Sequence, residues 1–417
     1  MKAKQEQRMG SGVALAVTSH VAANHSLMRE SNMALVAAEI FASGGGLSRA
    51  NVASRTGLTR ATVSRLVKDL IRMGIVVEAA PQDGQGAGRP ATPLFPAPNT
   101  MVGIGLEVNA DRVYGCALDL AGNTIDSFSV DVDLVGSSPA PVMELLEGRL
   151  EAMRNRLTAQ SIADIIAVNI GVPGIVDTTT NSVIYAPNLG WRNFRPADFL
   201  REMFGPTVPI WVENDANLQA ISVASPRVRD PNWPRSFFYV AGDVGIGGSM
   251  VSNGVPDVGR HGWAGEIGHI TIEPNGPSCS CGSAGCLEQY AGRQAILANA
   301  GLPASSSVEV VLDRVNAGDL AVTRAVSRAG WALGIAISNV INLLDVTHII
   351  LGTSLAPLLP LLRDPIDREL NRRVLGRASG DITVLAAPPE TSPTSRGGAL
   401  LALQGVVSDQ GRRAPEV

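Results

Sequence analysis

The stretch Gly259–Gly292 reads G-R-H-G-W-A-G-E-I-G-H-I-T-I-E-P-N-G-P-S-C-S-C-G-S-A-G-C-L-E-Q-Y-A-G. It holds three of the chain's four cysteines, and His269, Cys279, Cys281 and Cys286 follow the spacing His-x9-Cys-x-Cys-x4-Cys. One imidazole and three thiolates form a sufficient tetrahedral shell for a structural zinc ion and leave no position for water. Glycines between these residues let the backbone turn tightly enough to aim the sulfurs at one point. We therefore predict a loop held by zinc.

The alternative for these cysteines is a disulfide or a set of free buried thiols. A disulfide framework needs an oxidising compartment and usually an even number of cysteines. Here a histidine accompanies an odd trio, and the fourth cysteine, Cys116, lies far away in the sequence. Cys116 stands in the apolar run 113–118, so we expect it to be a small core residue.

Length and composition indicate a soluble protein of two or three domains. The chain has 417 residues, of which 45% are hydrophobic and 17% charged, and its net charge is −4. No uninterrupted apolar segment approaches the roughly 20 residues needed to cross a bilayer. Residues 1–24 resemble a secretory leader only faintly, because their apolar run is short. We interpret them as a flexible N-terminal tail and expect a cytoplasmic protein that does not enter the membrane.

The first hundred residues predict a helix-turn-helix. Ser48 is a plausible N-cap for a helix Arg49–Arg55, Gly57 breaks that helix, and Thr59 caps a second helix that runs to about Met73. A helix, a tight glycine turn and a second helix make the helix-turn-helix pattern. The apolar residues between positions 27 and 41 predict a third helix that packs beneath the other two.

Charge in this segment favours DNA as its partner. Six basic residues lie between positions 47 and 74 against a single acid, Asp69, and this local excess suits a phosphate backbone. The second helix buries an apolar stripe and turns its polar residues outward, as a recognition helix does. A strand at 75–78, a turn-rich segment 81–88 and Arg89 after it predict a wing. The residues predicted to meet DNA are Arg49, Thr59, Arg60, Thr62, Ser64, Arg65, Lys68 and Arg89.

Two alternatives stay open here. The segment could be a small helical oligomerisation domain with a solvated basic face. Arg89, which follows a glycine, suits a minor groove about as well as it suits a solvated linker.

The rest of the chain predicts an α/β domain and carries a family resemblance. Residues 101–109 and 113–118 indicate a β-hairpin, and apolar strands at 165–174 and 237–248 run into glycine turns. E-I-G-H followed by C-x-C-G-x-x-G-C-L-E resembles the signature of the ROK family, which contains bacterial sugar kinases and sugar-responsive transcriptional repressors. The resemblance extends from Val102 to about Val407. It implies a two-lobed actin-like ATPase fold with a ligand in the cleft.

The expected fold class is thus α/β, with an N-terminal winged helix-turn-helix domain followed by a two-lobed ROK or hexokinase-type domain. The N-terminal segment is similar to the winged domains that ROK repressors carry and ROK kinases lack. The expected ranges are a tail at 1–24, the DNA-binding core at 25–80, the wing and linker at 81–100, lobe 1 at 101–216 with 392–410, and lobe 2 with the zinc loop at 217–391.

The resemblance also implies a sugar site. The sequence Glu-Asn-Asp-Ala-Asn at 213–217 matches a family motif, and Asp215 stands at the position of the general base that takes the proton from the sugar hydroxyl in the kinases. His269 would bind zinc through one ring nitrogen and offer the other N–H to a ligand or a carboxylate. By resemblance, the sugar-binding residues are Asn188, Asn214, Asp215, Glu266, His269 and Glu288.

The nucleotide site departs from the kinase pattern. Where ROK kinases carry Asp-x-Gly-Gly-Thr, the corresponding positions of this chain are Gly105, Glu107, Val108 and Asn109. A carboxylate is missing where metal charge should be balanced, and another stands where phosphates should lie. Val244 replaces a threonine in the second phosphate loop, and the sequence Gly-Thr-Ser at 352–354 replaces a Gly-Gly turn. These departures predict that kinase activity has been lost.

We therefore expect a sugar-responsive transcriptional regulator with a structural zinc ion. Its partners would be operator DNA and a monosaccharide or sugar derivative, and it would act as a homodimer or a dimer of dimers. Repression relieved by sugar is the commoner arrangement in the family, although the sequence does not give the sign. The alternatives are an active ATP-dependent sugar kinase with an appended DNA-binding domain, and a non-catalytic protein whose cleft binds another protein.

Overall fold

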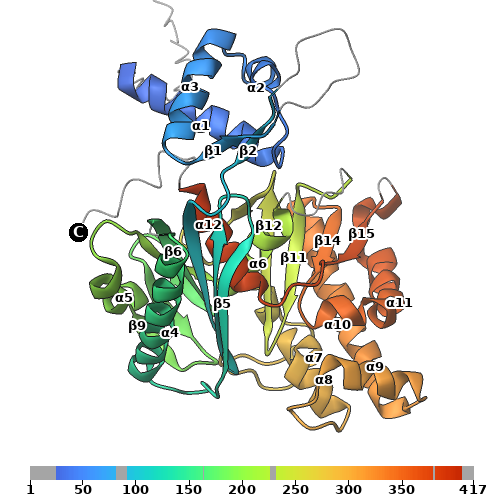
Figure 1. Ribbon diagram of the computed structural model, residues 1–417. Coiled ribbons are helices and arrows are strands. Elements are labelled where there is room, and N and C mark those ends of the chain that lie inside the picture. The colour runs from blue at the N-terminus through green and yellow to red at the C-terminus, as the bar shows by residue number, and fades with distance from the viewer. Residues whose placement is uncertain (1–24, 81–91, 163, 226–231, 379–380, 406–417) are drawn as a thin grey trace, which may run out of the picture.

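The computed structural model describes residues 25–80, 92–162, 164–225, 232–378 and 381–405. The expected tail at 1–24, most of the expected wing with Arg89, and residues 406–410 of expected lobe 1 lie outside these ranges. A small helical domain stands on one end of a larger α/β body that is built around two sheets (Figure 1). The expected fold class is confirmed.

The N-terminal domain has three helices and a two-stranded sheet. Its elements are α1 (His25–Ala42), α2 (Arg49–Thr56), α3 (Arg60–Arg72), β1 (Val76–Glu78) and β2 (Leu94–Pro96). Ser48 and Thr59 cap α2 and α3 as predicted, since each side chain accepts a hydrogen bond from the backbone N–H three residues later. Gly57 ends α2 with a φ of 72°, which only glycine adopts without strain. β1 and β2 pair antiparallel and form the base of a wing.

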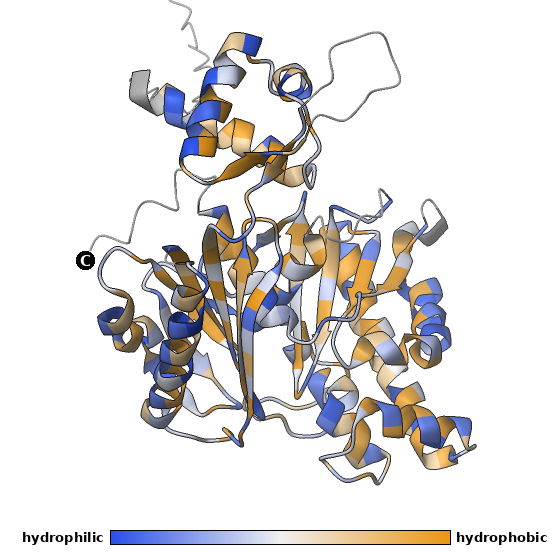
Figure 2. Cartoon of the chain, in the orientation of Figure 1, coloured by the Kyte–Doolittle hydropathy of each residue, from blue (hydrophilic) through white to orange (hydrophobic). Residues whose placement is uncertain are grey.

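Two sheets of the same topology form the larger body. In the first sheet the order is β10-β6-β3-β4-β5, and in the second it is β13-β12-β11-β14-β15. Each sheet combines an antiparallel three-stranded meander, β3-β4-β5 or β11-β12-β13, with two further strands that run parallel to the first strand of that meander. This repetition gives the two lobes of an actin-like fold, with hydrophobic strands buried between flanking helices (Figure 2).

Lobe 1 is built on the first sheet. Its strands are β3 (Met101–Val108), β4 (Arg112–Asp119), β5 (Thr124–Asp131), β6 (Asp164–Val172) and β10 (Ile210–Asn214). A smaller sheet adds β7 (Ile175–Asp177), β8 (Ser182–Ala186) and β9 (Trp191–Phe194). The helices are α4 (Pro139–Ala159), α5 (Pro196–Phe204) and α12 (Pro393–Gln404), the last of which returns from the far end of the chain. The next helix, α6 (Asp215–Ala224), packs on α12 and also contacts β12 of the other lobe.

Lobe 2 is built on the second sheet and carries more of the described helices than lobe 1. Its strands are β11 (Phe237–Gly242), β12 (Ile246–Ser252), β13 (Val255–Asp257), β14 (His348–Leu351) and β15 (Thr383–Ala386). Its helical elements are η1 (Ile267–His269), α7 (Glu288–Ala291), α8 (Arg293–Asn299), α9 (Val308–Asn316), α10 (Leu320–Leu344), α11 (Leu355–Arg373) and η2 (Leu375–Ala378). Within the described ranges, α10 alone is long and apolar enough to cross a membrane. It packs along α11 with 61% of its most apolar window buried, as a core helix does.

The N-terminal domain shares a hydrophobic core with lobe 1. Ile75, which directly precedes β1, and Leu94 of β2 belong to one buried cluster with Leu118 of β4 and Leu403 of α12. The connection is also fixed by hydrogen bonds, because the Thr100 hydroxyl donates to the carbonyl of Gly74 at 2.7 Å. Cys116 lies in the same cluster, 4% exposed, and burial raises the pKa of its thiol to about 12, so the expectation of a core cysteine is confirmed. The N-terminal domain is therefore seated on lobe 1.

Candidate functional site

Four side chains converge to form a site with the donor set and dimensions of a zinc centre. One ligand atom from each of His269, Cys279, Cys281 and Cys286 lies within 4.8 Å of all the others. The sulfurs of Cys281 and Cys286 are 3.7 Å apart, and the sulfur of Cys279 is 3.8 Å from Nδ1 of His269. Zinc–sulfur bonds of about 2.3 Å in a tetrahedron put sulfurs about 3.8 Å apart. The four predicted ligands therefore fit a zinc ion.

Close backbone packing holds this loop together. Isolated bridges join Thr271 to Cys286 and Ser278 to Ala284. Gly285 has a φ of 68°, and a Cβ on it would stand 1.7 Å from the carbonyl oxygen of Glu273. Only glycine fits at this position, which sets the approach of Cys286 to the other ligands.

A cavity of about 380 Å³ lies beside the metal cluster, between the two lobes. It is lined by all six residues that the sequence predicts for a sugar site, namely Asn188, Asn214, Asp215, Glu266, His269 and Glu288. They come from the β8–β9 loop, the end of β10, the start of α6, the segment around η1, and the start of α7. Its volume and its mixture of polar groups with apolar walls are typical of a small-molecule site.

Asn214 and Asp215 are fixed by the N-terminus of α6. The Asn214 side chain caps α6 by accepting from the N–H groups of Ala216 and Asn217, and its amide nitrogen donates to the Gly174 carbonyl at 3.0 Å. Asp215 accepts from the N–H of Ala216 at 2.9 Å. Burial, and then the neighbouring carboxylates, raise the pKa of Asp215 to about 7. Near neutral pH this carboxyl group is therefore able to donate as well as accept a hydrogen bond.

His269 faces the metal cluster on one side and a carboxylate on the other. Its Nδ1 is the ring nitrogen near Cys279, while its Nε2 lies 3.8 Å from Oε2 of Glu266. Burial raises the pKa of Glu266. The second acid, Glu288, occupies space that Gly245 leaves open, since a Cβ on Gly245 would stand 2.0 Å from a Glu288 carboxylate oxygen. The carboxylates of Glu266 and Glu288 and the imidazole of His269 thus line the cavity from lobe 2.

The cavity also contains residues that the sequence did not single out. Tyr185 lines it from β8, and the Arg192 guanidinium lies over the ring of Tyr185 at 3.8 Å. Asp243 lines it from the end of β11, and the Asn109 amide donates to this carboxylate at 2.9 Å across the cleft. The one available signal for Asp243 was a lone acid between the apolar run 237–241 and a glycine turn.

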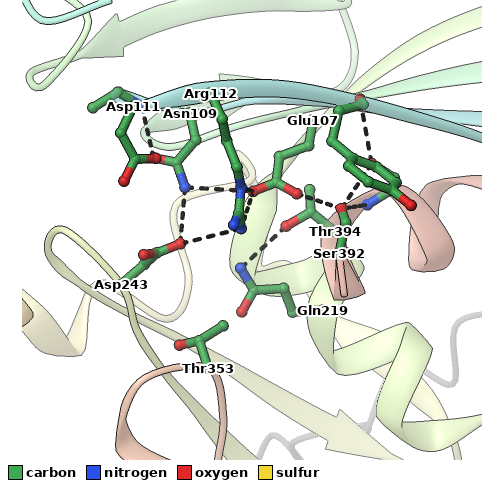
Figure 3. A network of polar contacts seen from close by, with 12 residues as sticks. Glu107, Asn109, Asp111, Arg112, Gln219, Asp243, Thr353, Ser392 and Thr394 are labelled. Carbon is green, nitrogen blue, oxygen red and sulfur yellow. Dashed lines mark hydrogen bonds and ion pairs between the residues drawn. The ribbon is translucent and has the colours of Figure 1, made fainter. Parts of the chain in front are cut away.

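A second cavity, of about 910 Å³, lies on the other side of Asp243. Asp243 lines both cavities. Between them a polar network joins lobe 1 to lobe 2 (Figure 3). Arg112 approaches Glu107 at 2.9 Å and Asp243 at 3.8 Å, and Arg293 pairs with Asp111 at 2.8 Å.

Glu107 is the centre of this network. It is 2% exposed, and besides Arg112 it accepts a hydrogen bond from the Ser392 hydroxyl at the start of α12. From the sequence, Glu107 is expected to repel phosphates as an anion. In the structure its charge is matched by Arg112, so it places a paired side chain at the end of β3, next to the hairpin turn.

Close packing surrounds two other positions where the sequence predicts departures from the kinase pattern. A Cβ on Gly105 would stand 1.7 Å from the carbonyl oxygen of Ser395, because α12 lies directly against β3. Thr353 adopts a φ of 44°, and its hydroxyl accepts from the N–H of Gly242 at 2.8 Å.

The predicted DNA-contacting residues divide into two groups. Arg49 forms an ion pair with Glu78 of β1, and Arg89 lies outside the described residues. Thr59, Arg60 and Arg65 are exposed at the start and outer face of α3, with Lys68 one turn further and Thr62 and Ser64 half-buried. Within the described ranges, Arg60, Arg65 and Lys68 form no ion pair, so no described acid neutralises the positive charge on this face of α3.

The single acid of this segment is fully engaged. Asp69 is buried beneath α3 and pairs with Arg29 at 2.6 Å and Arg72 at 2.9 Å. The hydrogen bond from Arg29 lowers the pKa of Asp69 most. Asp69 therefore links α1 to α3, and it does not neutralise the basic residues on the outer face of α3.

These features define a class of protein: a helix-turn-helix domain seated on a two-lobed domain with a sugar-kinase-like cleft and a zinc-type loop. The ROK family profile matches residues 103–405, so the chain belongs to the ROK family, and a MarR family profile matches residues 34–86. The xylose repressor of Bacillus spizizenii is 30% identical over 356 residues, which cover 84% of this chain and 89% of that protein.

Solved structures agree with this assignment. A ROK family transcriptional regulator described as a homolog of the E. coli MLC protein has a TM-score of 0.75 at 23% identity, covering 90% of this chain and 97% of the other. A ROK family glucokinase from Streptomyces griseus, in complex with glucose and AMPPNP, has a TM-score of 0.60 at 25% identity. That match covers 73% of this chain and 99% of the glucokinase. The regulator thus matches nearly the full chain, whereas the whole glucokinase accounts for about three quarters of it.

Proposed function

We propose that this protein is a cytoplasmic, sugar-responsive transcriptional repressor of carbohydrate-utilisation genes that lacks sugar kinase activity. The observation that carries the proposal is that an exposed basic helix, α3, and a polar interlobe cavity occur in one chain, while the cleft between the phosphate loops is bridged by the chain's own side chains. The xylose repressor that aligns along most of the chain supports the same function.

The sugar site of the proposal is the smaller cavity. Asn188, Asp215, Glu266 and Glu288 would bind sugar hydroxyls, since carboxylates and amides pair naturally with adjacent O–H groups. Asn214 would act mainly by holding Asp215 in place, because hydrogen bonds to α6 and to Gly174 already engage its amide. The glucokinase whose structure contains glucose supports a sugar as the ligand.

Zinc would stabilise the wall of this site. His269 and the three cysteines would hold the ion, which would anchor the loop. Nε2 of His269 faces Glu266, so it would then carry the ring proton and donate a hydrogen bond to Glu266 or to a ligand hydroxyl. The loop thereby orients Glu266 and His269 and closes one side of the cavity.

Kinase activity is proposed to be absent because the charged side chains of the expected phosphate region are already paired with one another. ATP chemistry needs cationic groups and backbone N–H donors that are free to surround phosphates. Arg112 is engaged by Glu107 and Asp243, and Arg293 by Asp111. The turn therefore presents paired side chains where a kinase would present a phosphate-binding loop. Asp215 would serve as a hydrogen-bonding partner for the sugar and not as a general base.

DNA would be bound through α3. Arg65 and Lys68 on its outer face, with Thr59 and Arg60 at its start, are proposed to meet base edges and phosphates in the major groove. A single short module makes few contacts, so a homodimer or a dimer of dimers would read two half-sites about one or two helical turns apart. Sugar would regulate binding by favouring one placement of the N-terminal domains over another.

The test uses zinc-loaded full-length protein. Bound genomic fragments are selected and sequenced, and the best fragment is titrated with protein in the presence of individual sugars. The proposal predicts nanomolar-range specific binding of about 10⁻⁸ M or tighter that one sugar weakens at least tenfold. Absence of any preferred DNA sequence would refute the regulator, and sugar phosphorylation from ATP at a rate of about 1–100 per second would instead establish the kinase alternative.

A further inference from the structure

The smaller cavity has an unusual balance of charge. Four carboxyl groups line it, those of Asp215, Asp243, Glu266 and Glu288. Among the described residues of its lining there is no lysine or arginine, and the one basic side chain, His269, has its Nδ1 turned to the metal cluster. A ligand in this cavity therefore meets four carboxyl groups, and no lysine or arginine of the described lining is there to offset them.

The nearest arginines are committed elsewhere. Arg112 lies between Glu107 and Asp243 and lines the larger cavity. Arg192 lies over the ring of Tyr185, with the tyrosine and not the guanidinium in the lining of the smaller cavity. Recruiting Arg112 to a ligand would leave the buried carboxylate of Glu107 without its partner, which is strongly unfavourable.

Asp243 stands at the boundary between the two cavities. Asp215 occupies the position that, in the kinases of this family, meets the hydroxyl to which phosphate is transferred. A phosphate already attached to that hydroxyl would therefore point toward Asp243 and be opposed by both carboxyl groups. Asn109 and Arg112 hold the Asp243 side chain in this place, so it cannot withdraw without breaking the contact between lobes.

We propose that the effector is a sugar without an anionic substituent, that the cavity rejects sugar phosphates and sugar acids, and that Asp243 is the residue that enforces this selection. The inference rests on the proposed sugar-sensing function and narrows its ligand class. Neutral hydroxyls suit the cavity because each carboxyl group can accept a hydrogen bond from them. A phosphate monoester carries nearly two negative charges and would be opposed by the four carboxyl groups, with no lysine or arginine of the described lining to offset them.

Calorimetry on the zinc-loaded full-length protein tests the selection. A panel of common aldopentoses, aldohexoses and 2-acetamido sugars is titrated, and each is paired with its terminal phosphate ester. We expect at least one parent sugar to bind and its phosphate ester to bind at least 100-fold more weakly, a difference of about 2.7 kcal/mol. A phosphate ester that binds as tightly as its parent, or more tightly, would overturn the inference while leaving sugar sensing intact. If no member of either series binds, the sugar-sensing function itself is wrong.

A pair of variants tests the role of Asp243. Asp243→Asn keeps the shape of the side chain and removes its charge. We expect this variant to reduce the ratio of the dissociation constants of phosphate ester and parent sugar at least tenfold. Glu309→Gln is the matched control, because Glu309 lines only the larger cavity. In this control the ratio of dissociation constants should stay as in the wild type. If the ratio of dissociation constants is unchanged in Asp243→Asn, and the variant unfolds at the same temperature as the wild type, Asp243 does not enforce the selection. If the variant fails to fold, Asp243→Ser is measured in its place.

Discussion

The pairing of Glu107 with Arg112 makes a sharp prediction about stability. Glu107 is almost fully buried, whereas the Arg112 side chain is 30% exposed. Replacing Arg112 with methionine would leave a buried carboxylate whose one remaining strong partner is the Ser392 hydroxyl. Breaking a buried pair in this way costs about 3–5 kcal/mol. We expect Arg112→Met to lower the free energy of unfolding of lobe 1 by about 3 kcal/mol.

The reciprocal variant should behave differently. In Glu107→Gln, Arg112 keeps its neighbour Asp243 and can turn toward solvent, so we expect a loss of only about 1 kcal/mol, the typical value of one hydrogen bond. The double variant Glu107→Gln/Arg112→Met should recover most of the stability lost in Arg112→Met, because no buried charge is left unpaired.

Urea unfolding of the zinc-loaded protein, followed by tryptophan fluorescence and circular dichroism, measures all three variants. Arg156→Met serves as the control, since Arg156 pairs with Asp126 on the surface of the same lobe and should cost under 1 kcal/mol. A loss of less than 1 kcal/mol in Arg112→Met, or a double variant no more stable than Arg112→Met alone, would show that Glu107 does not depend on Arg112 for its charge balance.

Four further results are expected. Elemental analysis of protein purified without added metal should find one zinc per chain, and Cys281→Ser should weaken both zinc retention and sugar binding; a native protein without zinc would refute the site. Arg65→Ala should weaken operator binding, with a smaller salt slope if Arg65 meets phosphate and an altered base preference if it reads a base edge; unchanged binding at two salt concentrations would count against this face of α3. Asp215→Ala should lower sugar affinity by about 1–3 kcal/mol in calorimetry while DNA binding without sugar stays near the wild type. Because the pKa of Asp215 is raised to about 7, the folded protein binds this proton while the unfolded chain has released it, so stability should fall as pH rises from about 4 to about 7; Asp215→Asn should flatten that part of the profile in thermal unfolding.

Local sequence signals predicted the N-terminal domain and the metal site. Helix caps act within three or four residues, so Ser48 and Thr59 could be read directly from their neighbours. The cluster of His269 and three cysteines spans only 18 residues of chain, and its spacing limits which side chains can meet. The residues of the proposed sugar site come from distant segments and were predicted only through the family resemblance, since no local rule brings Asn188 near Glu288.

Long-range pairing explains what the sequence did not predict. Arg112 is the first residue of β4 in a hairpin. Nothing near it in the sequence shows that its guanidinium reaches Glu107 and Asp243. The role of Asp243 depends on Asn109, which is 134 positions away. Such contacts form only when both sheets are folded and brought together, so they are properties of the assembled lobes.

The position of α12 limits how proteins of this architecture can exchange parts. The start of α12 contacts Glu107 through Ser392. Its middle lies so close to α6 that a Cβ on Gly397 would stand 1.7 Å from the Leu218 carbonyl oxygen. Its last turn joins the core of the N-terminal domain through Leu403. A chimera that joins this N-terminal domain to the lobes of a relative therefore needs a matching apolar surface on the relative's last helix. Grafting residues 25–100 alone would leave Ile75 and Leu94 against a foreign surface, whereas grafting α12 with them would preserve the contact through which the lobes orient the DNA-binding helices.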